Sequence, residues 1–302
     1  MDALGPGLWF KREDLAAEPL GGNKVRALEF LLGGVRAGDV VVTVGAEGST
    51  HALATAVYAR QLGARAQVIR WPQEMNEVAR RVSERIGREA DESVRVRTVI
   101  GAYAGALAAR FRGTKWIPAG GSSPLGILGQ VNAGLELADQ IRDRAMPKPG
   151  RIVVPLGTGG TAAGLALGFA IAQLEIEVIG VRVVPPLVAN RFHVRRLIGR
   201  TSRLIEQLSR ERVRRPGAGA IRLVHDFYGG AYGRVTAAGD DVARRCAEKH
   251  GLVIDPTYGA KALAAAVAVA RKEGGTTLFW LSFDARWMQQ SRSPEDGPVA
   301  LE

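Results

Sequence analysis

A chain of 302 residues, 46% hydrophobic and 24% charged, is long enough to bury the core of one large or two ordinary domains. Its single cysteine, Cys246, excludes a disulfide framework and cysteine-based metal sites, and predicts a reducing, cytoplasmic location. No apolar run approaches the roughly 20 residues that span a bilayer, and the N-terminus lacks a signal peptide's apolar core, so we expect no membrane association.

The formal net charge of +11 raises the question of nucleic-acid binding. The densest basic region, residues 191–215, has apolar residues at helical spacing between its arginines, which indicates amphipathic helices with a basic outer face. Apart from Phe192, it lacks aromatic residues suited to base stacking. We therefore expect no nucleic-acid partner.

Short runs of β-branched residues alternate with helical patterns along the chain. The first series has predicted strands at 40–44, 66–70 and 94–100, followed by helices at 49–62, at 73–87 and in an alanine-rich stretch. The second has strands at 151–155, 177–181 and 277–281, with a helix at 161–174. This alternation predicts an α/β fold of open, mostly parallel twisted sheets with helices on both faces.

A stretch rich in Gly, Pro and Ser, residues 118–129, lies between the two series. We therefore expect two α/β domains, a small one at 36–128 and a large one formed by 1–35 and 129–302. A cleft between two domains is a common place for a ligand.

Lys24 follows Gly21 and Gly22 and directly precedes an apolar helical repeat. Only seven of the 41 basic residues are lysines, so a lysine at this position is unusual. A partly buried lysine can act as an amine nucleophile, whereas arginine keeps its proton near neutral pH. Lys24 is thus a candidate to form a Schiff base with pyridoxal phosphate; the alternative is a surface lysine near a helix start.

A glycine-rich turn follows the strand predicted at 151–155 and opens an apolar helix. Its residues are Gly157, Thr158, Gly159, Gly160 and Thr161. Successive N–H groups at a helix N-terminus can bind phosphate. The turn lacks both the Gly-Lys-Ser/Thr of a P-loop and an acid placed to bind a ribose, so it favours a phosphate monoester over a nucleotide. The alternative is a tight strand–helix connection.

Ser49 and Thr50 have the corresponding place in the first series, where a helix N-terminus can bind a carboxylate. Ordinary N-capping by Ser49 is the alternative, and His51 is a further catalytic candidate. Tyr258 lies at a loop-to-helix junction, where its ring can stack on a flat ligand, and Tyr232 lies in a glycine-rich loop predicted to line the cleft. Either tyrosine could instead belong to the core.

Together these segments resemble the 1-aminocyclopropane-1-carboxylate deaminase and D-cysteine desulfhydrase family, within the tryptophan-synthase-β-like (fold type II) pyridoxal-phosphate enzymes. The resemblance runs from Trp9 to about Ser282, and its most specific pieces are residues 10–15, 21–30 and 118–137. It implies pyridoxal 5'-phosphate in the interdomain cleft, a small amino-acid substrate and a homodimer.

By this resemblance, Lys24 forms the Schiff base, and Asn23 and Thr50 belong to the cofactor site. The turn from Gly157 to Thr161 binds the cofactor's phosphate. Further roles are implied for four residues: Ser49 contacts the substrate carboxylate and assists proton transfer, Tyr258 packs near the pyridine ring, Tyr232 is a second active-site tyrosine, and Ser282 lies near the pyridine nitrogen.

The chain departs from the family's pattern at several positions. Gly48 and Thr50 stand in a run that is usually Gln-Ser-Asn-His, so Thr50 offers a shorter hydroxyl in place of an amide. Ala27 replaces a basic residue, and Gly259 has no side chain to meet the pyridine nitrogen. Phe283 stands in the run Leu-Ser-Phe-Asp, where the family has His-Thr-Gly-Gly.

The resemblance implies a lyase or deaminase that converts a small amino acid into an oxo acid and ammonia, with Lys24 removing a substrate proton. A neutral Ser282 hydroxyl beside the pyridine nitrogen would favour elimination over transamination. The alternatives are racemisation, β-replacement, or a cofactor-binding protein whose catalysis is impaired by the departures.

Overall fold

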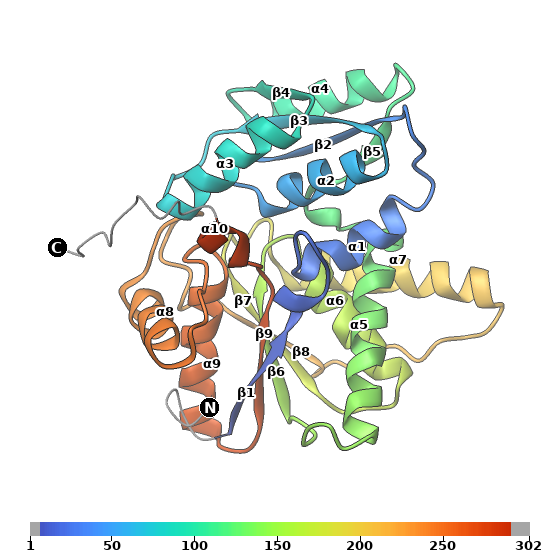
Figure 1. The fold of residues 1–302 in the computed structure, drawn as a ribbon. Coiled ribbons are helices and arrows are strands. Elements are labelled where there is room, and N and C mark those ends of the chain that lie inside the picture. Colours follow the sequence, from blue (N-terminus) through green and yellow to red (C-terminus); the bar gives the residue numbers. More distant parts are fainter. Residues whose placement is uncertain (1–6, 291–302) are drawn as a thin grey trace.

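The computed structural model describes residues 7–290, which form alternating strands and helices (Figure 1). The strands are β1 (Leu8–Arg12), β2 (Val40–Ala46), β3 (Arg65–Trp71), β4 (Glu92–Arg95), β5 (Lys115–Ile117), β6 (Arg151–Leu156), β7 (Glu177–Arg182), β8 (Ile221–Val224) and β9 (Thr277–Leu281). The α-helices are α1 (Asn23–Leu31), α2 (Thr50–Gln61), α3 (Glu77–Glu89), α4 (Val99–Arg110), α5 (Pro124–Arg142), α6 (Gly160–Ile171), α7 (Arg191–Ser209), α8 (Ala237–His250), α9 (Gly259–Glu273) and α10 (Arg286–Gln290), with short 3-10 helices at Glu13–Leu15 and Ala119–Gly121.

Two sheets organise the chain, as the sequence predicted. One has the strand order β4-β3-β2-β5 and the other β1-β9-β6-β7-β8, and neighbouring strands pair in parallel throughout. We call the part around the four-stranded sheet, residues 40–117, the small lobe, and the part around the five-stranded sheet the large lobe; the small lobe lies above the large lobe in Figure 1. The proposed domain boundary at residue 36 lies between α1 and β2 and that at 128 within α5, and the division itself remains a prediction.

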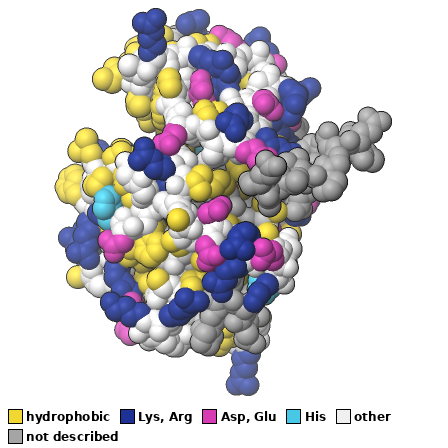
Figure 2. All heavy atoms as spheres, turned by 90° about the vertical axis from the view of Figure 1, so that its left-hand side faces the viewer, with side chains coloured by type: hydrophobic (Ala, Val, Ile, Leu, Met, Phe, Trp, Pro, Cys, Tyr) yellow, Lys and Arg dark blue, Asp and Glu magenta, His cyan; other side chains and the backbone are white. Residues whose placement is uncertain are grey.

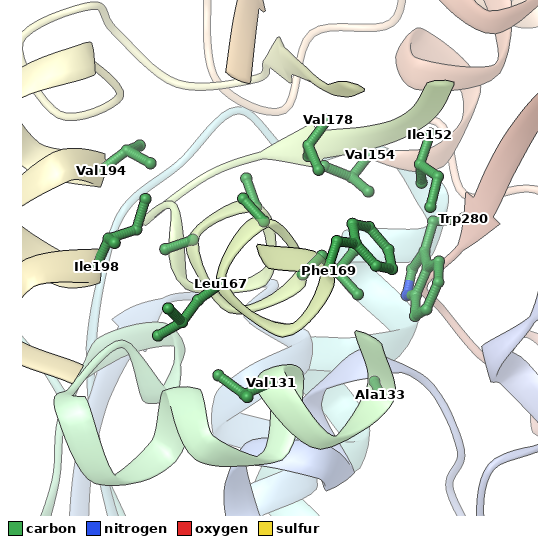
Figure 3. Close-up of a cluster of buried hydrophobic side chains, with 14 of the residues drawn as sticks. Val131, Ala133, Ile152, Val154, Leu167, Phe169, Val178, Val194, Ile198 and Trp280 are labelled. Atoms are coloured by element: carbon green, nitrogen blue, oxygen red, sulfur yellow. The ribbon is translucent and has the colours of Figure 1, made fainter. Parts of the chain in front are cut away.

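The five-stranded sheet is buried on both faces because its strands are apolar at successive positions. Ile152 and Val154 of β6 face the layer formed by α5, α6 and α7, whereas Val153 between them faces α8 and α9. Figure 3 shows α6 between the sheet and α5, with Phe169 of α6 beside Trp280 of β9. Because successive apolar side chains point to opposite faces of the sheet, helices pack on both faces. The strand ends stay uncovered and can form a site.

The four-stranded sheet is covered in the same way. Val41 and Val68 pack against α2 and α3, and Val42 and Ile69 pack against the alanines of α4. The carboxyl ends of β2 and β3 lead to Ser49 and Gln73, on the side of the sheet where ligands bind in open α/β structures.

Two predicted elements were misplaced, each because of a helix cap. The strand predicted at 94–100 ends at Arg95, since Thr98 caps α4 by accepting a 3.0 Å hydrogen bond from the Gly101 N–H. The helix predicted at 73–87 begins at Glu77, where Asn76 caps it through the Ala79 N–H. The short strands β1, β5 and β8 were not predicted.

The basic region at 191–215 starts with the predicted amphipathic helix, α7, which buries Val194, Leu197 and Ile198 and exposes its arginines. On the face shown in Figure 2, Lys and Arg side chains are scattered over the upper and lower parts of the molecule, with Asp and Glu between them. Within residues 7–290, no helix has the length and apolar character needed to cross a membrane.

Candidate functional site

A cavity of about 520 Å³ lies where the carboxyl ends of strands from both sheets meet. Its lining includes every residue that the sequence predicted for the site: Asn23, Lys24, Ser49, Thr50, Gly157, Thr158, Gly159, Gly160, Thr161, Tyr232, Tyr258 and Ser282. The fold therefore brings together segments that are spread over most of the chain. The cavity's size is in the range of small-molecule and cofactor sites.

The turn before Lys24 is fixed by the end of β9. Gly22 has φ of +99°, and a Cβ there would lie 2.6 Å from the carbonyl oxygen of Ser282, so only glycine fits. The Asn23 N–H donates to that same carbonyl at 3.0 Å. The Asp284 carboxylate accepts a 3.0 Å hydrogen bond from the Gly21 N–H. Residues 282–284, where this chain departs from the family's ending, therefore hold the start of α1.

Charged side chains anchor α1 to β1 and α5. Arg26 donates two hydrogen bonds to buried Glu13, at 2.8 and 2.9 Å, and one to Glu136 at 2.7 Å. Lys11 of β1 donates to Glu136 at 2.6 Å. Ala27 is buried against Gly121 of the short 3-10 helix, where a Cβ on Gly121 would lie 2.9 Å from the Ala27 methyl. The Ala27 methyl thus leaves room only for glycine at position 121.

Lys24 presents an unusually acidic ammonium group to the cavity. Burial lowers its pKa to about 8, and the negative charge of Asp255 opposes the shift. Within the described part of the chain, Lys24 Nζ donates no hydrogen bond and forms no ion pair. A lysine amine of this pKa is partly neutral near physiological pH and able to act as nucleophile and base.

The glycine-rich turn before α6 has the features of an anion site. Gly159 is in the left-handed conformation, and no side chain caps the helix, so its first N–H groups remain available. Thr161 accepts a 2.7 Å hydrogen bond from the Asn23 amide, and the Thr158 hydroxyl pairs with that of Ser122 at 2.6 Å. Ser122 was not singled out from the sequence, although it lies in the family-like stretch 118–137.

The turn before α2 is held from the side by Gln73. Ser49 caps the helix by accepting from the Ala52 N–H at 3.2 Å, which confirms the ordinary capping role without excluding a second one. The Gln73 side-chain oxygen accepts from the Gly48 N–H at 3.1 Å, and Gln73 itself lines the cavity. A Cβ on Gly48 would lie 2.6 Å from that of Ala79, so the usual glutamine does not fit at position 48. No sequence motif indicated Gln73.

His51 lies at the cavity wall as a neutral ring. Its side chain is buried, and neither ring nitrogen makes a hydrogen bond within residues 7–290; the Pro118 carbonyl lies nearby without satisfying hydrogen-bond geometry. Burial and then the positive charge of Lys24 lower the His51 pKa to about 3. The ring therefore carries no charge at physiological pH.

Tyr232 and Tyr258 form a pair that lines the cavity. Their hydroxyls are hydrogen-bonded to each other, and their rings meet edge to face with centroids 5.8 Å apart. Burial raises the pKa of Tyr232 to about 12 and that of Tyr258 well above its ordinary value, so both phenols keep their protons. Tyr228, the other tyrosine of the glycine-rich loop, does not line the cavity and contacts Lys261 instead.

Buried Asp255 sets the backbone that carries Tyr258. Its carboxylate accepts hydrogen bonds from the N–H groups of Tyr258 at 2.7 Å and of Gly259 at 2.9 Å. A Cβ on Gly259 would lie 2.7 Å from this carboxylate, and Gly259 does not line the cavity. Ser282 and Phe283, by contrast, do line the cavity. The side chain missing at position 259 is therefore excluded by packing in this chain.

These groups fit pyridoxal phosphate. The free Lys24 amine suits its aldehyde, the uncapped α6 turn with hydroxyls beside it suits its phosphate, and the aromatic wall suits its ring. The fold and site thus define a two-sheet parallel α/β enzyme that holds a phosphorylated cofactor at a lysine.

A family model described as "Pyridoxal-phosphate dependent enzyme" matches residues 2–282, and the chain belongs to this family. The predicted fold type, cofactor and enzyme family are confirmed, and pyridoxal phosphate is the cofactor.

Named relatives cover most of the chain. Nocardicin C-9' epimerase of Nocardia uniformis subsp. tsuyamanensis is 34% identical over 303 residues, 93% of this chain and 87% of the relative. D-cysteine desulfhydrase of Salmonella newport (strain SL254) is 30% identical over 287 residues, 87% of this chain and 81% of the relative. A solved structure described as the ACC deaminase homologue matches with a TM-score of 0.75 and 29% identity, over 94% of this chain and 87% of that chain.

Proposed function

We propose that this enzyme is a lyase or deaminase that converts a small amino acid into an oxo acid and ammonia. D-Cysteine, which would give pyruvate, sulfide and ammonia, and 1-aminocyclopropane-1-carboxylate, which would give 2-oxobutyrate and ammonia, are the two candidate substrates. The D-cysteine desulfhydrase relative and the solved structure described as the ACC deaminase homologue support this reaction class. A homodimer remains an expectation from the family resemblance, and a cytoplasmic location remains an expectation from the sequence.

The free Lys24 amine is the observation that carries the proposal. With its pKa lowered to about 8 and no acceptor among the described residues, Lys24 Nζ is suited first to hold the cofactor and then to take a proton from the substrate. In D-cysteine this proton is on Cα; in the cyclopropane amino acid, whose Cα carries no hydrogen, it is on a ring CH2 group. Pyridoxal phosphate, when bound, would withdraw electrons from the substrate Cα. The N-terminal turn of α6, with Thr158 and Thr161, would bind its phosphate, and Asn23 orients Thr161.

The N-terminus of α2 would bind the substrate carboxylate. Ser49 and Thr50 line the cavity there, and the positive end of the helix attracts a negative charge. Gln73, bonded to the Gly48 N–H, closes one side of this turn. Neutral His51 adds no charge to the region, so the helix end and the hydroxyls define the carboxylate's position.

The tyrosine pair would supply a proton donor on the other wall of the cavity. Both phenols are protonated, and each can pass a proton to the other through their hydrogen bond. Ser282 offers an uncharged hydroxyl, which cannot protonate a pyridine nitrogen as a carboxylic acid can. Such a site favours elimination over transamination.

The test is cofactor binding followed by turnover. Protein incubated with pyridoxal phosphate should gain the visible absorbance of a bound Schiff base, and Lys24→Ala should lose that band. D-Cysteine should then yield sulfide and pyruvate, or the cyclopropane amino acid 2-oxobutyrate. A band that survives in Lys24→Ala, or cofactor-loaded protein that releases ammonia from neither substrate, would contradict the proposal.

Epimerisation is a second candidate, because the epimerase relative matches this chain at 34% identity over 93% of its length. The same Lys24 amine would remove the Cα proton, and a proton would return to that carbon with no group lost. Loss of optical activity without release of ammonia would favour this reaction over elimination.

A further inference from the structure

The side-chain amide of Asn76 joins the two lobes beside the tyrosine pair. Asn76 caps α3 in the small lobe, where its Oδ1 accepts a 2.9 Å hydrogen bond from the Ala79 N–H. Its Nδ2 donates to two groups of the large lobe, the carbonyl of Gly233 at 3.0 Å and the hydroxyl of Thr257 at 2.9 Å. The amide oxygen therefore accepts a hydrogen bond from its own helix, and the amide nitrogen donates hydrogen bonds to the opposite lobe.

The two acceptors adjoin the two tyrosines. Gly233 follows Tyr232 and Thr257 precedes Tyr258, and the tyrosine hydroxyls are bonded to each other. One amide group of the small lobe is thus bonded to both segments that carry the pair. Asn76 itself does not line the cavity, so it acts on the site only through these neighbours.

We call the hydrogen bonds from Asn76 to Gly233 and Thr257 the Asn76 bridge. Other contacts hold the same segments, but they differ from this bridge. Buried Lys261 of α9 donates to the carbonyl of Tyr228 at 2.7 Å, which fixes the glycine-rich loop within the large lobe. The ion pair of Arg234 with Glu74, at 3.4 Å, does cross between the lobes. Its side chains are about half exposed, and such pairs contribute little. The Asn76 bridge is the less exposed link between the small lobe and both tyrosine segments.

We propose that Asn76 is a positioning residue for the tyrosine pair. Its amide holds Tyr232 and Tyr258 against each other while the lobes are in the arrangement seen here, and movement of the small lobe away from the large lobe releases both segments together. The importance of Asn76 for turnover rests on the proposed function, because that function is what gives the tyrosine pair its task.

The first test is hydrogen–deuterium exchange on protein without cofactor. Asn76→Asp keeps the oxygen that caps α3 but places a carboxylate opposite the Gly233 carbonyl. Exchange in 227–236 should rise about tenfold, as expected for the loss of the hydrogen bond to Gly233, while 79–80 stays protected. The rise in 255–259 should be smaller, because the Thr257 hydroxyl can donate to the new carboxylate. Thr257→Val, which leaves the cap untouched, should raise exchange in 255–259 alone.

Asn190→Asp is the matched control. Asn190 also caps a helix, through the His193 N–H at 2.8 Å, and its Nδ2 donates to the Leu187 carbonyl at 2.9 Å within the same lobe. This variant should leave exchange in 227–236 and 255–259 unchanged. Unchanged exchange in Asn76→Asp, or an equal rise in Asn190→Asp, would overturn the bridge.

The second test is steady-state kinetics with cofactor-loaded protein. Asn76→Asp should lower kcat about tenfold or more with KM and cofactor affinity within twofold of the parent, because the site's binding groups stay in place. A kcat equal to that of the parent would overturn the positioning role. The exchange result needs no substrate, so it decides whether the bridge exists even if neither candidate amino acid is turned over.

Discussion

The side-chain amide of Asn23 donates a 2.7 Å hydrogen bond to the hydroxyl of Thr161, which lies 138 positions further along the chain. The bond joins the residue before Lys24 to the turn that begins α6. Gln130 of α5 donates to the Asn23 carbonyl at 2.6 Å and supports the same point. The lysine and the phosphate turn are therefore held at a fixed separation, as a cofactor bound at both ends requires.

Thr161→Val should weaken cofactor binding. The change removes the acceptor of the Asn23 amide with little change in shape, and a lost hydrogen bond of this kind costs about 1–1.5 kcal/mol, or roughly five- to tenfold in affinity. Titration with pyridoxal phosphate measures the effect. Thr201→Val, at a buried hydroxyl of α7 without a hydrogen-bond partner within residues 7–290, is the matched control and should bind the cofactor as the parent does.

Tyr232→Phe and Tyr258→Phe should each lower kcat by about a hundredfold or more, since a positioned proton donor typically contributes that much. Cofactor affinity should change no more than a few-fold, because the rings remain. Tyr228→Phe, outside the cavity, should retain the parent's kcat. Full activity in both paired variants would show that the phenols move no proton in the slow step.

His51 should make the cofactor-free protein less stable in acid. Burial lowers the His51 pKa to about 3 in the folded protein, whereas its ordinary value is near 6.5. Between these two pH values, only the unfolded chain therefore binds a proton at this residue. Stability should therefore fall by about 1 kcal/mol per pH unit from this residue as pH decreases from about 6.5 towards 3. Urea unfolding of His51→Leu across this range should show a shallower dependence; an identical slope would assign the acid sensitivity to other groups.

Two helical glycines should respond oppositely to alanine. A Cβ on Gly129 would lie 1.7 Å from the carbonyl oxygen of Arg26, where α5 meets α1, so Gly129→Ala should destabilise the protein by about 1–3 kcal/mol and weaken cofactor binding by displacing α1. Gly199 of α7 has no atom within 4 Å of such a Cβ. Gly199→Ala should stabilise the protein by about 0.5–1 kcal/mol. Chemical unfolding decides both, and equal effects would contradict the packing seen here.

Much of the architecture was predictable from local pattern. Apolar strands alternating with helices predicted two parallel sheets, and the motifs around Lys24 and Gly157 predicted the residues that line the cavity. The errors were local too: the cap at Thr98 ended a strand early, because a side-chain hydrogen bond overrode the β-branched pattern. The three-residue strand β5 has too short a pattern to stand out.

The departures from the family's pattern could be explained only from the folded structure. Gly48 and Gly259 read in sequence as lost functional groups, yet a Cβ at these positions would clash with Ala79 and Asp255, respectively. Ala27 is buried against Gly121. Gln73 and Asn76 lie in no motif, since each matters only through a partner distant in sequence. Ser122 lies in the family-like stretch 118–137, but its hydrogen bond with Thr158 is visible only in the structure.

The sequence by itself determined which chemical groups are available: an amine at Lys24, a glycine-rich anion turn, and hydroxyls and phenols. The segments that carry them follow one another in the order typical of the family. Only the tertiary structure decided the state of these groups. The lowered pKa of Lys24, the protonated tyrosine pair and the neutral His51 all arise from burial, and burial depends on which distant segments the fold packs together.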